Sequence, residues 1–112
     1  MKKLISITFV VIAVLVIAFG SPARAEPDLA VGRSVFNANC VACHKGGANL
    51  VMAAKNLQKA TLEKYNMASM DAIQYQVKNG KNAMPAFSGR LDDRQIESVA
   101  AYVLAQADAN WQ

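Results

Sequence analysis

The stretch Cys40-Val41-Ala42-Cys43-His44 is the most informative part of this 112-residue sequence. Cys-x-x-Cys-His is the attachment signature of c-type haem, in which both cysteine sulfurs bond to the macrocycle and the histidine ligates iron. On a helical turn, positions i, i+3 and i+4 lie on one side, so the two sulfurs and the imidazole can meet one flat ring together. The motif predicts one haem c, attached covalently through Cys40 and Cys43, with His44 on the iron.

Three other interpretations of the motif are weaker. A thioredoxin-like dithiol needs a βαβ setting, which the helical patterns described below do not offer. A structural zinc site usually takes four Cys or His ligands, and residues 26–112 contain only Cys40, Cys43 and His44. A local disulfide is compatible with an oxidising compartment but gives His44 no role.

His44 is the only histidine, so the sixth position on the iron is empty, holds water or is filled by a residue of another type. Methionine is the usual partner in cytochromes c, and residues 26–112 offer Met52, Met67, Met70 and Met84. Met84 is favoured because it is far from His44 and because Pro85 biases it toward an extended conformation. An ordinary core methionine is the alternative interpretation of Met84.

The first 25 residues have the layout of a secretory signal peptide. Lys2 and Lys3 precede an apolar run of 11 residues, 9–19, and Ala23-Arg24-Ala25 supplies a small-x-small end. We therefore expect a signal peptide at 1–25 and a cytochrome c domain at 26–112. An uncleaved membrane anchor is the alternative, but a membrane-spanning helix needs about 20 apolar residues, and this run has 11.

Processing changes the charge of the chain. Three of the 12 basic residues and none of the 8 acidic ones lie in residues 1–25, so the formal net charge falls from +4 to +1. Composition then gives no support to nucleic-acid binding, and the processed chain is not expected to be embedded in a membrane. At 87 residues the core is barely sufficient, and a covalent haem would add apolar bulk to it.

Apolar spacing predicts an all-α domain of about four helices. The clearest helix follows Asp92, which can cap it in a capping box with Gln95, and its apolar face has helical spacing: Ile96, Val99, Ala100, Val103 and Leu104. Leu91 can pack on Ile96 as a hydrophobic staple.

Three further helices are expected before it. Asp28 can cap one that runs to about Cys40 and turns Leu29, Gly32, Val35 and Phe36 toward one side. Gly32 suggests the close approach of another helix, through Val99 or Tyr102. Residues 60–65 predict a short helix. Ser69 can cap a third with the stripe Met70, Ile73, Val77, closed by Asn79-Gly80. Residues 45–56 are expected to form a loop, and no period-two alternation predicts a sheet.

Beyond single motifs, the sequence resembles the cytochrome c6 family of cyanobacterial and algal photosynthesis. The resemblance extends over nearly all of residues 26–112 and includes Asp28-Leu29-Ala30-x-Gly32, Val35-Phe36-x-x-Asn39-Cys40-x-x-Cys43-His44, Gly46-Gly47-x-Asn49, Tyr75-Gln76-Val77-x-Asn79-Gly80-Lys81-x-Ala83-Met84-Pro85-Ala86-Phe87, Arg90-Leu91, Val99-Ala100-x-Tyr102-Val103 and Trp111. The run around Met84 narrows the resemblance from c-type cytochromes in general to this family.

The resemblance implies a class I cytochrome c fold around one haem c. It implies covalent attachment at Cys40 and Cys43, with His44 and Met84 as axial ligands. Further roles carried over by position are contacts near the haem propionates for Asn49, Lys55 and Lys81, support of a high potential for Gln76, and docking for Arg90. Plain surface charge is the alternative for Lys55, Lys81 and Arg90. Ala53 and Asn56 depart from the residues common in the family.

The resemblance also implies a function. The expected protein is a monomeric electron carrier, not an enzyme, that takes electrons from cytochrome f of the cytochrome b6f complex and donates them to photosystem I, with cytochrome oxidase as another acceptor. The signal peptide is compatible with the thylakoid lumen or a periplasm. A respiratory carrier that serves a terminal oxidase is the main alternative, and a haem enzyme or gas sensor the second.

Overall fold

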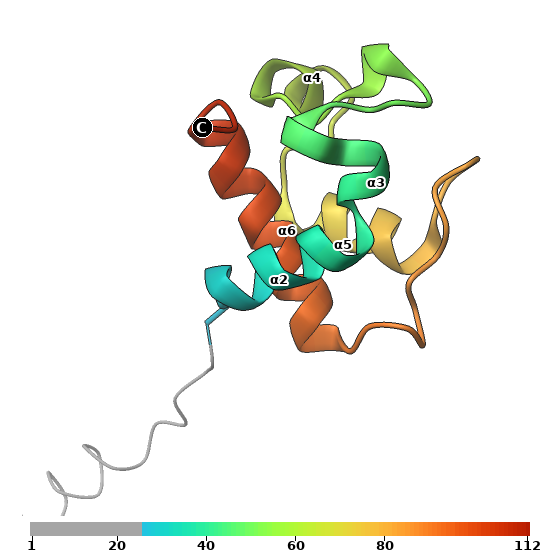
Figure 1. The fold of residues 1–112 in the computed structure, drawn as a ribbon, viewed down its shortest axis with the longest axis vertical. Coiled ribbons are helices and arrows are strands. Elements are labelled where there is room, and N and C mark those ends of the chain that lie inside the picture. Colours follow the sequence, from blue (N-terminus) through green and yellow to red (C-terminus); the bar gives the residue numbers. More distant parts are fainter. Residues whose placement is uncertain (1–25) are drawn as a thin grey trace, which may run out of the picture.

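The computed structural model describes residues 26–112, and these residues are helical (Figure 1). The elements are α2 (Leu29–Asn39), α3 (Val41–His44), the 3-10 turns η1 (Lys45–Gly47) and η2 (Ala53–Lys55), α4 (Lys59–Lys64), α5 (Met70–Asn79) and α6 (Asp93–Asp108). This part of the chain has no strand and only two isolated bridges, Lys81 to Met84 and Ser88 to Leu91. The predicted signal peptide lies outside the described residues.

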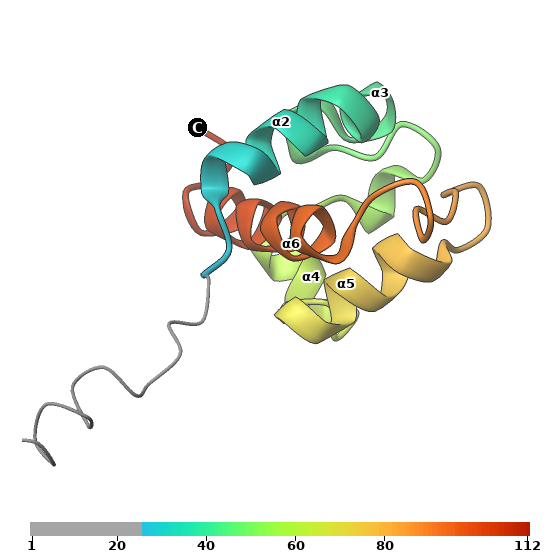
Figure 2. The ribbon, with the colours of Figure 1, turned by 90° about the horizontal axis from the view of Figure 1, so that it is seen from below.

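Helix α6 is the centre of the core. It packs against α2 on one side and against α5 on the other (Figure 2). Its buried apolar side chains are Ile96, Val99, Ala100, Val103 and Ala107; the partners that meet them are Val35, Phe36, Leu62, Ile73, Val77 and Phe87. Among these helices none is both long and apolar enough to cross a membrane.

The start of α6 is fixed by the predicted capping box. An Asp92 carboxylate oxygen accepts from the Gln95 backbone N–H at 2.8 Å, and the Gln95 side-chain oxygen accepts from the Asp92 N–H at 2.9 Å. Two of the N–H groups that a helix start leaves without partners are thereby satisfied. The predicted apolar face is buried, with Ile96 only 1% exposed and Leu91 packed against the core.

Helix α2 crosses α6 at Gly32. Asp28 caps α2 as predicted, accepting from the backbone N–H groups of the next turn. A Cβ at Gly32 would collide with the Ser98 carbonyl and lie 2.8 Å from the Tyr102 Cβ, so the expected close approach of another helix is confirmed. The expectation that Leu29 shares the buried side is wrong. Leu29 is 51% exposed, because it lies almost one turn before the crossing.

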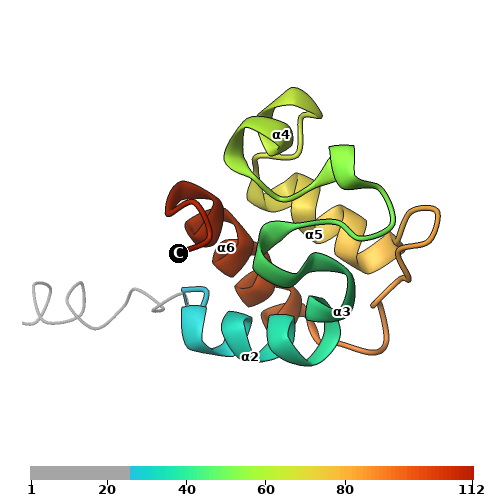
Figure 3. The ribbon, with the colours of Figure 1, turned by 45° about the horizontal axis from the view of Figure 1, so that its top comes forward.

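The shorter elements follow the expected pattern with small shifts. Helix α4 begins one residue earlier than predicted, and α5 has the Ser69 cap and the Gly80 end that the sequence indicates. The predicted loop 45–56 contains η1 and η2. Figure 3 shows this green segment between α2–α3 and α4.

Candidate haem site

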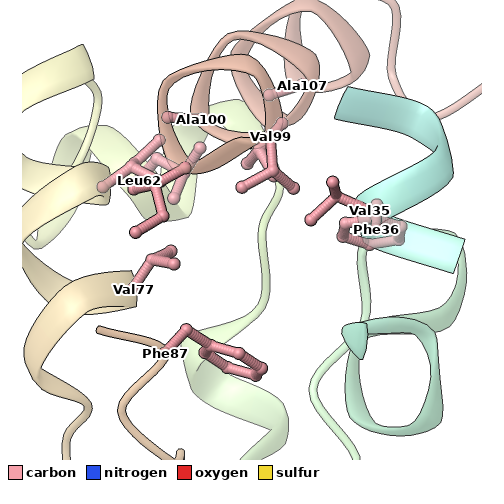
Figure 4. Close-up of a cluster of buried hydrophobic side chains, with 11 residues drawn as sticks. Val35, Phe36, Leu62, Val77, Phe87, Val99, Ala100 and Ala107 are labelled. Atoms are coloured by element: carbon pink, nitrogen blue, oxygen red, sulfur yellow. The ribbon is translucent and has the colours of Figure 1, made fainter. Parts of the chain in front are cut away.

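An apolar cleft opens between the α2–α3 region and α5. Its empty volume, including space open to solvent, is about 1230 Å³. Figure 4 shows Phe36 on one side of this space and Val77 and Phe87 on the other. Leu62, Ile73, Val99 and Val103 complete the apolar lining. Such walls suit a large flat apolar ligand and keep water from it.

The Cys-x-x-Cys-His motif borders this cleft. Cys40 ends α2 and begins the single turn α3, and both cysteines and His44 line the cleft. Cys40 is half-buried and Cys43 is exposed, and no disulfide joins them. Burial raises the pKa of Cys40 to about 11. Because a redox dithiol attacks as the thiolate, this environment does not fit the thioredoxin-like interpretation.

The imidazole of His44 is held by a backbone hydrogen bond. Its Nδ1 lies 2.9 Å from the Ala48 carbonyl oxygen, so Nδ1 carries the proton and Nε2 keeps the lone pair that can bind a metal. Between His44 and Ala48 the chain turns at Gly46 and Gly47, whose φ values are +64° and +80°. Glycine adopts this left-handed conformation readily, which accounts for the pair directly after the motif.

Met84 reaches the same cleft from a separate segment. The segment leaves α5 at Gly80, and Lys81 and Met84 exchange two backbone hydrogen bonds of 3.0 and 2.9 Å. The Gln76 side-chain amide donates to the Met84 sulfur at 3.5 Å. Met52 and Met67 also line the cleft, whereas Met70 packs against the core as its position in the α5 stripe predicts.

The polar residues predicted near the propionates also border the cleft. Asn49, Lys55 and Lys81 all line it. The Asn49 amide donates to the Lys55 carbonyl at 2.9 Å, and its oxygen accepts from the N–H groups of Val51 and Met52. The ammonium of Lys55 lies 5.4 Å from the ring centre of Tyr65.

Arg90 lies outside the cleft lining. It is exposed, and its guanidinium carbon lies 4.8 Å from the ring centre of Phe87. Phe87 is itself part of the cleft wall, so Arg90 contacts a residue of that wall without lining the cleft.

Sequence reasoning missed two parts of this site. The Ala48 carbonyl that holds His44 has no side-chain signal, because every residue carries a carbonyl. Trp111 carries no sequence signal beyond its place at the end of the family resemblance. Its indole N–H donates to the carbonyl of Leu57, a residue that lines the cleft, at 2.9 Å.

A helical domain whose Cys-x-x-Cys-His turn borders an apolar cleft, with a methionine reaching that cleft from elsewhere, is a class I c-type cytochrome. A family model described as "Cytochrome C oxidase, cbb3-type, subunit III" matches residues 27–103. The relatives that match over almost their full lengths identify the family more narrowly than this model does. They show that the chain belongs to the cytochrome c6 family. It is 59% identical to cytochrome c6 of Nostoc sp. (99% of each chain) and 53% identical to that of Pyropia yezoensis (99% of this chain, 100% of the relative).

A solved structure agrees with the sequence relatives. Cytochrome c6 of the diatom Phaeodactylum tricornutum matches with a TM-score of 0.73 at 52% identity, covering 75% of this chain and 99% of that chain. Members of the family carry one covalently attached c-type haem, and the donor set and apolar walls of the cleft fit that group. The protein is therefore an electron carrier of photosynthetic electron transport.

Proposed function

We propose that this protein carries single electrons from cytochrome f of the cytochrome b6f complex to photosystem I, as a monomer in the thylakoid lumen and without catalysing a reaction of its own. The observation that carries the proposal is the pair His44 and Met84. Each reaches the apolar cleft from a different element, and each is held by its own hydrogen bond.

In this proposal Cys40 and Cys43 would hold the haem covalently, and His44 Nε2 and the Met84 sulfur would bind its iron. When bound, the haem supplies an iron that cycles between the ferrous and ferric states. Ala48 fixes the His44 ring and Gln76 contacts the Met84 sulfur, so both side chains keep their places in either state. Little rearrangement then accompanies electron transfer.

The surroundings of the cleft support a high reduction potential. A thioether is a soft ligand that favours ferrous iron, and apolar walls disfavour the extra charge of the ferric state. None of the described residues that line the cleft is acidic. Lys55 and Lys81 are the cations at its rim, which suits two carboxylates of a haem.

We propose Arg90 as the docking residue for photosystem I. The mature net charge of +1 and two propionates leave the whole molecule at about −1, so long-range steering is weak and electrostatic help is local. Arg90→Glu should slow electron donation to photosystem I in single-turnover kinetics more at low than at high salt. The matched control is Arg33→Glu, exposed on α2 and outside the cleft lining. Equal slowing at all ionic strengths would contradict a charge-based role.

The same kinetic experiment tests the acceptor itself. With wild-type protein, rapid oxidation by isolated photosystem I and slower oxidation by a terminal oxidase is the expected result. The reverse order would support a respiratory carrier. Ready binding of carbon monoxide by the ferrous protein would instead indicate an open sixth position and favour an enzyme or sensor.

We further propose that the chain is exported through a cleaved signal peptide, the lumen being the expected destination and a periplasm the alternative. Mass spectrometry of the native protein should show a chain that starts at Glu26 and carries one haem. A mature protein that retains residues 1–25 would contradict this part of the proposal.

A further inference from the structure

The end of the chain is tied back to the segment that follows the haem-binding motif. After α6, Asn110 and Trp111 have φ values of +54° and +60°. Residues other than glycine rarely adopt this left-handed backbone conformation. This turn brings the Trp111 indole onto residues far away in the sequence. Its Nε1–H donates to the Leu57 carbonyl oxygen at 2.9 Å, and its ring centre lies 5.3 Å from that of Phe36.

The indole also covers Gly47. A Cβ added there would lie 2.5 Å from ring atoms of Trp111, so only glycine allows this approach. The Leu57 N–H in turn donates to the Gly47 carbonyl at 2.7 Å. Trp111, Leu57 and Gly47 therefore form one cluster, here called the Trp111 clamp. Figure 3 shows the C-terminus beside the segment that contains Gly47.

The Trp111 clamp ends one residue away from the partner of the axial histidine. Gly47 directly precedes Ala48, whose carbonyl lies 2.9 Å from His44 Nδ1. The Ala48 N–H, in the peptide that joins Gly47 to Ala48, donates to the Lys45 carbonyl at 3.2 Å and closes η1. The clamp and this hydrogen bond thus both act on the peptide that leads into Ala48.

We propose that Trp111 is a positioning residue for His44 and acts through Leu57, Gly47 and the Ala48 carbonyl. The inference rests on the proposed role of His44 as an axial ligand. A hydrogen bond from Nδ1 makes the imidazole a stronger donor at Nε2 and stabilises ferric iron. Weakening the clamp weakens that bond, so the reduction potential rises and the Nδ1 proton exchanges faster with solvent.

The test compares Trp111→Phe with Ile96→Val in the haem-loaded protein. Phenylalanine keeps an aromatic ring but removes the donor to Leu57. Ile96→Val removes one methylene from the α6 core at a position that does not line the cleft, with a comparable loss of stability expected. Proton NMR of the ferrous protein follows exchange of the His44 Nδ1 proton, and redox titration gives the potential.

In Trp111→Phe the Nδ1 proton should exchange at least about tenfold faster than in wild type, the factor that corresponds to one lost hydrogen bond, and the potential should rise. The control should match wild type in both. Trp111→Ala should move both values further. Exchange in Trp111→Phe no faster than in the control overturns the proposal. A His44 ring without haem-induced shifts in wild type would instead overturn the axial assignment on which it rests.

Discussion

His44 and Met84 are held by partners of different kinds. The backbone carbonyl of Ala48 holds His44, whereas the side chain of Gln76 contacts Met84. A side-chain substitution cannot delete a carbonyl, but it can delete an amide. Under the proposed ligation, the methionine side of the site is therefore the one at which a single substitution would change a contact of an iron ligand directly.

Changing Gln76 to leucine should lower the reduction potential. The amide N–H draws electron density from the Met84 sulfur, and without it the thioether is a better donor to ferric iron. Redox titration measures the shift. Gln74→Leu is the matched control, because Gln74 lies on the same helix but does not line the cleft. The same shift in both variants would show that the amide at Gln76 has no particular role.

Replacing Met84 by alanine should leave the haem attached, lower the potential and let carbon monoxide bind the ferrous iron. The controls are Met52→Ala and Met67→Ala, since both residues also line the cleft. Neither control should open the iron to carbon monoxide. If Met84→Ala keeps both its potential and its resistance to carbon monoxide, another side chain is the ligand.

At the level of helices, the crossing of α2 over α6 depends on Gly32. In Gly32→Ala the new methyl group meets the Ser98 carbonyl and the Tyr102 Cβ. Overpacking of this kind costs about 1–3 kcal/mol, more than the helix propensity that alanine adds. Urea unfolding should show the loss. Ser34→Ala, on the exposed side of the same helix, should leave stability nearly unchanged. Gly32→Ala as stable as wild type would mean that the helices separate at no cost.

The helices could be predicted well because their signals are local. Asp92 and Gln95, which form the capping box of α6, are three residues apart. Ser69 and Ala72 are also three residues apart, and the Ser69 hydroxyl accepts a hydrogen bond from the Ala72 N–H. The same holds for the haem-binding motif, whose five residues are consecutive. The clamp between Trp111 and Leu57 joins residues 54 positions apart through a backbone oxygen. Such a contact leaves no pattern in a single sequence.

Over the whole molecule, the cleft occupies space that a domain of this size would otherwise fill with its own side chains. Its walls include Phe36, Leu62, Val77 and Phe87, all buried and all part of the core cluster that the described residues form. Without a haem these walls face each other across open space, and a small domain has little stability to spare.

Changing Cys40 and Cys43 together to serine should therefore abolish covalent haem and remove most of the helical structure. Circular dichroism at 222 nm measures the helix content, and the pyridine haemochrome spectrum shows whether haem is attached. A fully folded, haem-free double variant would mean that the core closes the cleft by itself.

The Asn49 side chain has a consequence for how this family can vary. Its three hydrogen bonds, to Lys55, Val51 and Met52, all use backbone atoms of those residues. The bend from 49 to 55 is thus specified by one asparagine and not by the side chains along it. Leu50, which is 72% exposed and does not line the cleft, can therefore be replaced without altering the shape of the bend. A change of side chain at this outward position would leave the lining of the cleft as it is.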